Sequence, residues 1–261
     1  MLLDAADRIA TLPSADGVRQ RQGLRVVAHR PWPLPNGPWV MGQTWEHLLF
    51  AHWRVDAQAL RSVVPAELAL DRFDGDSWLG ITPFEVRGLR LRAMAPLPWL
   101  SRFPELNVRT YVTLDGKPGI YFFSLDAGRA LAVAGARAGY RLPYVHANMR
   151  IRRSGDWTVY RSERPGAAFR AYYRAISDPA SAAPGTLEHF LTERYCLYTV
   201  QPGRVRRTEI HHPPWPLQLA QAEIEHNTMA APIGIELTGE PLLHYAARED
   251  VLVWPPAQVP A

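Results

Sequence analysis

The sequence predicts a mainly β protein of the α+β class, folded as a single domain around a large, mostly antiparallel sheet or barrel. About ten to twelve segments have strand character, whereas only three short helices are expected. Strands do not alternate with helices as in a doubly wound fold, and no repeat of about 20–50 residues recurs. No linker divides the chain. We therefore expect one domain over residues 41–255, with a wrapping segment at 1–40 and a short tail at 256–261.

The clearest hairpin signal lies in residues 105–125, ELNVRTYVTLDGKPGIYFFSL. Residues 107–114 alternate between polar and apolar, an Asp-Gly pair can turn the chain, and residues 119–125 run back. The return strand is apolar on both faces, so it should be central and covered on both sides. Arg109 and Tyr111 lie on the polar face of the first strand. This placement suggests a site inside the sheet or at its mouth.

The other elements follow from capping residues, alternation and turns. The three short helices are expected at 57–63, 128–140 and 187–192, and residues 3–11 are a further candidate for a short helix. Strands are expected at 41–55, 68–73, 78–86, 144–152, 157–164, 169–176, 195–200, 205–211, 218–227 and 242–247. The segments 68–73 and 78–86 should pair as a second hairpin, and residues 88–104 should form a long loop.

Alternation assigns side chains to the two faces of the strand at 41–55. Trp45 and Leu49 are expected on one face, and Leu48 and Phe50 on the other. Both faces combine large apolar groups with histidine, so we expect the histidines to be hydrogen-bonded residues of the core or of its rim.

Composition limits the classes of partner. The chain has 261 residues, of which 47% are hydrophobic and 21% charged, which is enough for a sizeable core. The formal net charge is +4, and Lys117 is the only lysine among 29 basic residues. The arginines are not gathered into one run with interleaved aromatic residues, so we expect no nucleic-acid partner. No apolar run reaches the roughly 18 residues of a membrane span, so no membrane association is expected.

Motifs for common cofactors are absent from the sequence. It contains no phosphate-binding loop, no dinucleotide-binding fingerprint and no nucleophile elbow, so we expect no cofactor. His211 and His212 are adjacent and would point to opposite faces of a strand, which argues against a metal site. The N-terminal residues do not have the pattern of a secretory signal. Cys196 is the single cysteine and cannot form an internal disulfide, so we expect a cytoplasmic protein and a buried, unreactive thiol.

Several long runs of the sequence resemble one family. They are MGQTWEHLLFAHWRV, VVPAELALDRFDGDSWLGITPF, ELNVRTYV with GKPGIYFFSLDA, LPYVHANM, and LTERYCLYT with HHPPWPLQLA. The resemblance covers residues 43–253, and the chain is identified as a member of the YqjF-like family of uncharacterised bacterial proteins. That family is grouped with the acetoacetate-decarboxylase-like fold. The resemblance therefore implies a cone-shaped, mostly antiparallel β-barrel with a ligand cavity.

The resemblance does not carry over the decarboxylase reaction. Decarboxylases of this fold form a Schiff base through a lysine that stands shortly after a proline. The similar place here follows Pro143, where Tyr144 and Val145 stand instead of two lysines. Lys117 lies in the turn DGKPG, where we expect a solvated charge. Arginine cannot act in place of the lysine because it stays protonated. The chain therefore resembles a decarboxylase scaffold without the decarboxylase nucleophile.

Arg109 is the first candidate for a ligand-binding residue. An arginine in so apolar a region needs an acidic partner or an anionic ligand. A structural ion pair with Glu105, Glu193 or another acid is the alternative. Tyr144 and His146 share the polar face of the strand at 144–152, about 7 Å apart, and are candidates for a catalytic acid–base pair. A solvent-facing polar row is the alternative for these two residues.

Four more residues are candidates for ligand binding. Tyr111 shares the strand face of Arg109, and Arg137 lies on the expected helix at 128–140. Tyr195 belongs to the segment TERY, and His212 lies in the rigid turn HHPPWP, where a purely structural role is the alternative.

Two functions remain open after these exclusions, with a third behind them. The chain could be an enzyme that acts on a small carboxylate or carbonyl compound without Schiff-base chemistry. It could instead be a non-catalytic binder of a small apolar acid. The third is a structural or interaction protein, which a filled barrel and a large exposed apolar patch would favour. A small-molecule ligand fits the first two, and the sequence leaves a homo-oligomer open.

Overall fold

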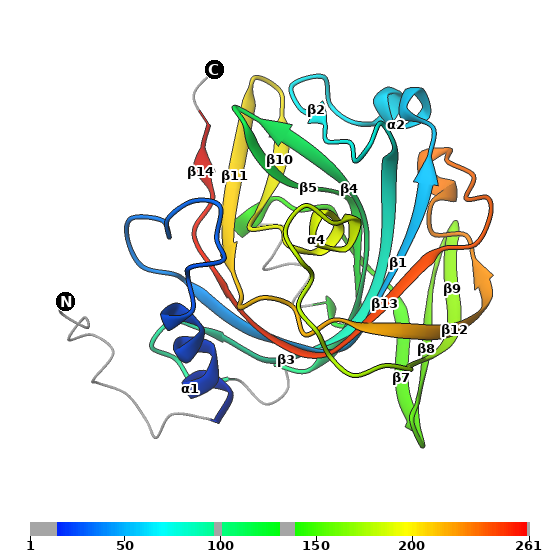
Figure 1. Cartoon of the computed structure of the whole chain (residues 1–261), viewed down its shortest axis with the longest axis horizontal. Coiled ribbons are helices and arrows are strands. Elements are labelled where there is room, and N and C mark those ends of the chain that lie inside the picture. Colours follow the sequence, from blue (N-terminus) through cyan, green and yellow to red (C-terminus); the bar gives the residue numbers. More distant parts are fainter. Residues whose placement is uncertain (1–14, 97–100, 131–138, 260–261) are drawn as a thin grey trace.

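The computed structural model describes residues 15–96, 101–130 and 139–259, and these form one fourteen-stranded, mostly antiparallel sheet with a few short helices. Seven strands close into a ring, because β11 pairs with β13 through Ile210 and Val253. The ring follows the order β11 (Arg204–His211), β10 (Cys196–Gln201), β5 (Lys117–Ala127), β4 (Phe103–Leu114), β3 (Ser77–Leu91), β1 (Met41–Val55) and β13 (Leu242–Val253). Figure 1 looks along this barrel. The expected mainly β fold is confirmed.

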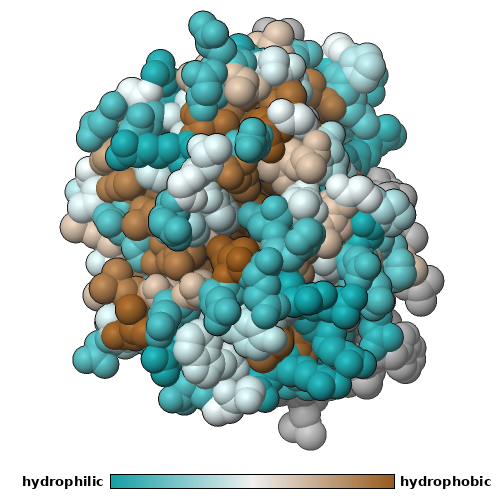
Figure 2. Space-filling view, turned by 90° about the vertical axis from the view of Figure 1, so that its right-hand side faces the viewer, coloured by the Kyte–Doolittle hydropathy of each residue, from teal (hydrophilic) through white to brown (hydrophobic). Residues whose placement is uncertain are grey.

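A second layer covers one side of the barrel. From β13 the sheet continues through β12 (Gln218–Asn227), β9 (Ala167–Ala175), β8 (Trp157–Arg164) and β7 (Asn148–Ser154) (Figure 1). Tyr160, Phe169 and Tyr173 from this layer pack against Leu49 and Val108 on the outer face of the barrel, and all five are at most 1% exposed. Polar and apolar side chains mix on the side of the molecule where β9 and β12 lie (Figure 2). The second layer therefore buries the outer faces of β1, β3 and β4 and leaves their inner faces to line the barrel.

The remaining elements are short. Three strands lie at the margins of the sheet: β2 (Ala69–Leu70), β6 (Tyr144–His146) and β14 (Ala257–Gln258). The helices are α1 (Ala15–Gln22), α2 (Ala57–Val63), α4 (Leu187–Thr192) and the 3₁₀ turns η2 (Gly23–Arg25) and η3 (Ala231–Ile233). Asp56 caps α2 by accepting hydrogen bonds from the amides of Gln58 and Ala59, as the sequence predicts. No helix among the described residues is both long and apolar enough to cross a membrane.

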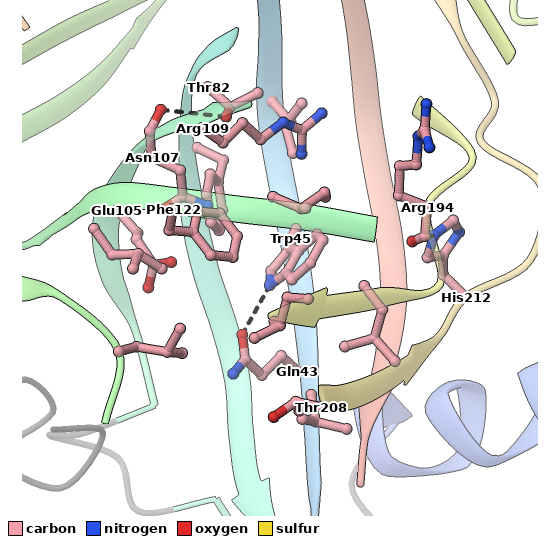
Figure 3. A pocket seen from close by; sticks show the side chains of 18 of the residues that line it. Gln43, Trp45, Thr82, Glu105, Asn107, Arg109, Phe122, Arg194, Thr208 and His212 are labelled. Carbon is pink, nitrogen blue, oxygen red and sulfur yellow. Dashed lines mark hydrogen bonds between the residues drawn. The ribbon is translucent and has the colours of Figure 1, made fainter. Parts of the chain in front are cut away.

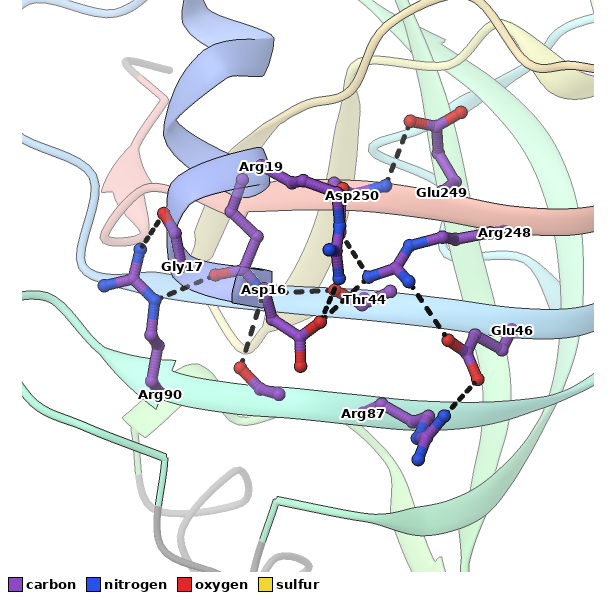
Figure 4. Close-up of polar contacts among 12 residues, drawn as sticks. Asp16, Gly17, Arg19, Thr44, Glu46, Arg87, Arg90, Arg248, Glu249 and Asp250 are labelled. Atoms are coloured by element: carbon purple, nitrogen blue, oxygen red, sulfur yellow. Dashed lines mark hydrogen bonds and ion pairs between the residues drawn. The ribbon is translucent and has the colours of Figure 1, made fainter. Parts of the chain in front are cut away.

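Helix α1 packs against the outside of the barrel and forms polar contacts with its strands (Figure 4). Arg248 on β13 donates to Asp16 at 3.0 Å and lies 3.4 Å from Glu46 on β1. Arg90 on β3 donates to the side-chain oxygen of Gln20 at 2.9 Å. Gln20 is only 1% exposed, so this part of the N-terminal segment is an integral layer of the fold.

Four expectations about local structure are wrong. The hairpin between 68–73 and 78–86 does not form, because β2 pairs with β4 and the turn is closed only by a bridge between Phe73 and Asp76. The expected strand at 144–152 is two strands, β6 and β7, which separate at Ala147 and join different neighbours. The last strand, β13, runs to Val253, well beyond the expected end at 247. Finally, the loop expected at 88–104 is shorter, since β3 extends to Leu91 and β4 begins at Phe103.

A bulge in β1 changes which side chains face inward. His47 has a φ of +54°, and the pairing with β3 is irregular between Glu46 and Ala51. As a result Trp45 lies on the same inner face as Leu48, not on the face of Leu49. The strict alternation expected for β1 therefore fails at His47. The expected helix at 3–11 and most of that at 128–140 lie outside the described residues.

The close approach of β5 to β10 gives a test of the barrel. A Cβ atom at Gly119 would lie 2.8 Å from the Cys196 sulfur and 2.9 Å from the Cys196 carbonyl oxygen. We expect Gly119→Ala to lower the free energy of unfolding by about 1–3 kcal/mol through overpacking. Gly139→Ala is the matched control, because nothing lies within 4 Å of its Cβ position. Equal midpoints for the two variants in urea unfolding would show that the two strands are not packed this closely.

Candidate functional site

The barrel encloses a cavity of about 80 Å³. All seven strands of the ring contribute to its wall, together with the segments next to β6, α4 and β11. The wall is mostly apolar, and its large side chains include Trp45, Phe84, Phe122, Tyr140 and Trp215. The cavity is smaller than the roughly 300–1,000 Å³ pockets that hold drug-sized ligands, so it suits a small organic molecule.

Strand β4 supplies a row of polar side chains to this cavity. Glu105, Asn107 and Arg109 alternate with Leu106 and Val108, which pack outward against the second layer. Figure 3 shows the three polar residues on one wall, with Arg194 and His212 also at the cavity. The site suggested by the polar face of the central hairpin is therefore a cavity wall in the structure.

Arg109 is a buried cation without a carboxylate partner among the described residues. Only 6% of its surface is exposed. Its Nη2 donates to the carbonyl oxygen of Leu191 at 3.2 Å and to the hydroxyl of Tyr111 at 3.4 Å, while its Nε is buried and has no partner. The alternative of an ion pair with Glu105 or Glu193 is not what the structure contains. An uncompensated buried charge is costly, so the geometry favours an anion as the missing partner.

The two acids considered as partners of Arg109 are engaged elsewhere. Glu193 accepts hydrogen bonds from the Trp215 amide at 2.9 Å and from the hydroxyl of Tyr195. The carboxyl of Glu105 accepts a hydrogen bond from the Tyr144 hydroxyl at 3.2 Å. Arg194, the other arginine at the cavity, is paired with Asp71 at 2.5 Å. Arg109 is thus the cation of the described cavity wall that no acid neutralises.

Glu105 and Tyr144 form a hydrogen-bonded pair at the cavity. Burial raises the pKa of Glu105 from 4.5 to about 8, and the nearby charge of Asp126 adds to the rise. Burial and the neighbouring Glu105 also raise the pKa of the Tyr144 hydroxyl well above 10. At neutral pH both groups therefore hold protons. The Tyr144 hydroxyl donates its hydrogen bond to Glu105, and the Glu105 carboxyl can donate a hydrogen bond or a proton to an oxygen atom in the cavity.

Tyr144 stands where the family resemblance places the Schiff-base lysine. It follows Pro143 directly, and its side chain lines the cavity. Lys117 does not approach this place, because its Nζ lies 3.6 Å from Glu209 and 5.1 Å from the centre of the Trp32 ring. The described part of the cavity wall therefore carries a tyrosine–carboxyl pair and no lysine.

The structure separates the other expected site residues. His146 is exposed and does not line the cavity, so it is not brought together with Tyr144. Tyr111 is fully buried behind Arg109, and Tyr195 is buried against His212, with 4.8 Å between ring centres. His212 does line the cavity, and burial lowers its pKa. Arg137 lies outside the described residues.

Sequence reasoning missed several residues of the wall. Glu105 was considered only as a partner of Arg109, although its position two and four residues before Asn107 and Arg109 places it on the same strand face. Trp45 was assigned to the wrong face because of the bulge at His47. No sequence signal shows that Thr208 reaches the cavity. Among the described residues, no group of three or more His, Cys, Asp or Glu side chains could hold a metal ion.

The comparisons with known proteins decide the family. The model of the DUF2071 family, described as an uncharacterized conserved protein, matches residues 42–250. The chain belongs to this family. It is also 50% identical to the uncharacterized protein YqjF of Bacillus subtilis strain 168. The alignment extends over 226 residues and covers 85% of this chain and 93% of YqjF. The membership expected from the sequence runs is therefore confirmed.

Solved structures confirm the acetoacetate-decarboxylase-like fold. The acetoacetate decarboxylase from Legionella pneumophila matches with a TM-score of 0.59 at 12% identity, covering 96% of this chain and 98% of the decarboxylase. The enduracididine biosynthesis enzyme MppR complexed with pyruvate matches with a TM-score of 0.58 at 11% identity, covering 89% and 94%. These structural matches establish a shared fold, and identities this low do not establish a shared reaction.

The buried carboxyl of Glu105 should make stability depend on pH. The folded state keeps a proton that the unfolded chain releases, so this group lowers the free energy of unfolding as pH rises from about 4.5 to about 8. The loss is on the order of 3–5 kcal/mol for a shift of this size. We expect Glu105→Gln to remove this part of the pH dependence in urea unfolding between pH 5 and 8.

Glu163→Gln is the control for this measurement, because Glu163 is an exposed carboxyl on β8. It should leave the loss of stability with rising pH in place. Parallel pH profiles for Glu105→Gln and the unmodified protein would mean that Glu105 ionises normally in the folded state.

Proposed function

We propose that this protein binds a small organic anion in the barrel cavity, with the anion's carboxylate on Arg109, and acts on a carbonyl group of that molecule by general acid–base chemistry. The observation that carries the proposal is the buried guanidinium of Arg109, which lacks an acidic partner among the described residues. A carboxylate is the natural partner, since it can accept two parallel hydrogen bonds from a guanidinium.

Glu105 and Tyr144 supply the acid–base groups of the proposal. In its ionised form, which a pKa of about 8 keeps accessible near neutral pH, the Glu105 carboxylate can take a proton from the carbon next to the carbonyl group and then give that proton to the carbonyl oxygen, which forms the enol. The Tyr144 hydroxyl donates its hydrogen bond to Glu105 and so orients that carboxyl group. Proton transfer next to a carbonyl, such as enolisation, needs no Schiff base. The structure of MppR with pyruvate supports this class of ligand, because it is a small oxo acid bound to a protein of the same fold.

A non-catalytic binder is the second candidate function. The mostly apolar wall, with Trp45, Phe84 and Phe122, favours it, because such a wall can hold the hydrocarbon part of an apolar acid without chemistry. Both candidates use Arg109 as the anchor. They differ in whether the pair Glu105–Tyr144 changes the ligand or only contacts it.

The anchor is tested by thermal shift with a panel of small carboxylic and oxo acids. A ligand at about 100 times its dissociation constant should add about 2.7 kcal/mol of stability. We expect Arg109→Met to abolish the shift, since it removes the positive charge and keeps an unbranched side chain. Arg150→Met, an exposed arginine on β7, is the matched control and should keep the shift. A shift that survives in Arg109→Met would remove the anchor from both candidates.

Turnover of a bound acid then separates enzyme from binder. Exchange of its α-protons with deuterium, followed by proton NMR, reports enolisation directly. We expect Tyr144→Phe and Glu105→Gln to slow exchange by about 10²-fold or more while binding changes little, because general acid–base groups contribute about 10²–10⁴-fold to rates. Exchange no faster than in buffer would assign the protein to the non-catalytic class. No hit anywhere in the panel would favour an interaction protein instead.

A further inference from the structure

Behind the cavity wall, Arg109 rests on buried polar groups that the proposed chemistry does not use. The Tyr111 hydroxyl lies 2.6 Å from Nε2 of His52 and 2.8 Å from the carbonyl oxygen of Leu191. Nη2 of Arg109 contacts the same carbonyl and the same hydroxyl. His52, Tyr111 and Leu191 are 0% exposed. These contacts join β1, β4 and the last turn of α4 at one point.

The number of available protons determines which of these groups donates and which accepts in each hydrogen bond. Burial, with the charges of Arg109 and His244, lowers the pKa of His52 well below 6.5, so its ring is neutral and carries one N–H. Nδ1 of His52 is buried and has no partner. A buried N–H without an acceptor is rare, which places the proton on Nε2. His52 then donates to the Tyr111 oxygen, and the single hydroxyl proton of Tyr111 goes to the Leu191 carbonyl.

We propose that His52 and Tyr111 are positioning residues for the anion site. His52 orients the hydroxyl group of Tyr111 by donating a hydrogen bond to it. Tyr111 and the carbonyl group of Leu191 then hold the guanidinium of Arg109 in one orientation. The inference rests on the proposed anion site and names how that site is prepared. In this arrangement the Tyr111 oxygen accepts from both His52 and Arg109. Each hydrogen bond among these four residues then has one donor proton and one acceptor.

The positioning leaves specific donors of Arg109 for a ligand. A guanidinium has five N–H donors, and both of its hydrogen bonds here come from Nη2. Nε has no partner, and Nη1 makes no hydrogen bond with the described residues. Holding the guanidinium before the anion arrives lowers the ordering cost of binding. Its carbon also lies 5.3 Å from the centre of the Phe50 ring, which restricts the plane further.

The absence of a side chain at Gly80 is part of the same arrangement. A Cβ atom there would lie 3.0 Å from Cδ2 and 3.1 Å from Nε2 of His52, and 3.3 Å from Cγ of Arg109. Strand β3 therefore passes close to both residues at a position where it carries no side chain. A side chain at this position would push against the His52 ring and the stem of Arg109.

The test uses matched variants and 4-oxopentanoate as the probe, with affinity measured by calorimetry. Tyr111→Phe should weaken binding about tenfold, the size expected when one hydrogen bond that orients a charged group is lost. His52→Asn should do the same. His52→Gln should stay within about twofold of the unmodified protein, because the Gln amide can place an N–H close to the Nε2 position whereas the shorter Asn amide cannot.

A second readout is independent of stability and of the probe. The nitrogen and carbon chemical shifts of His52 in the ligand-free protein distinguish the two tautomers, and the Nε2–H form is expected. The Nδ1–H form, or unchanged affinity in Tyr111→Phe and His52→Asn, would overturn the positioning role while Arg109→Met still abolished binding. If the unmodified protein does not bind the probe, or Arg109→Met binds it equally well, the proposed anion site fails and the positioning inference falls with it.

Discussion

A buried positive charge without a protein counter-charge is the constraint around which this cavity is arranged. Arg109 is 6% exposed, and its partners are a carbonyl oxygen and a hydroxyl. Neutral acceptors reduce the cost of such burial but do not cancel the charge. The nearby acids are engaged by Tyr144, Tyr195 and the Trp215 amide. Within the described part of the chain, one cation thus has no acidic partner inside a barrel that is otherwise mostly apolar.

The barrel tolerates this buried charge because the two faces of each strand lie in different environments, one in the apolar core and one at the cavity. On β4, Leu106 and Val108 enter the core between the layers, whereas Glu105, Asn107 and Arg109 face the cavity. The cost of polar groups on the inner face is balanced by the apolar burial on the outer face. At the position that the resemblance assigns to the decarboxylase lysine, the cavity here carries Tyr144, whose hydroxyl donates to Glu105. A tyrosine–carboxyl pair can transfer protons but cannot form the covalent bond to carbon that a lysine forms.

Much of the fold could be predicted from the sequence, because it depends on local signals. The hairpin at 105–125, the Asp56 cap and the strands β8, β9 and β12 follow from alternation and turn residues. The errors have tertiary causes. The bulge at His47 reversed the face of Trp45, and β2 pairs with β4 rather than with its neighbour in sequence. At the candidate site, residue type and strand face made Arg109 and Tyr144 candidates, and both line the cavity. His146 was not excluded, because alternation cannot show that a strand ends after three residues. The sequence does not indicate an acid–base role for Glu105, because its raised pKa depends on burial, which no local pattern reports.

The stability of Arg109→Met without ligand tests the central claim most directly. If Arg109 is an uncompensated charge kept for an anion, its replacement by an apolar side chain of similar length should leave the free energy of unfolding unchanged or raise it. The measurement is urea unfolding in a buffer without carboxylates. A loss of about 3 kcal/mol or more, the cost of breaking a buried ion pair, would contradict the account and make Arg109 a structural residue.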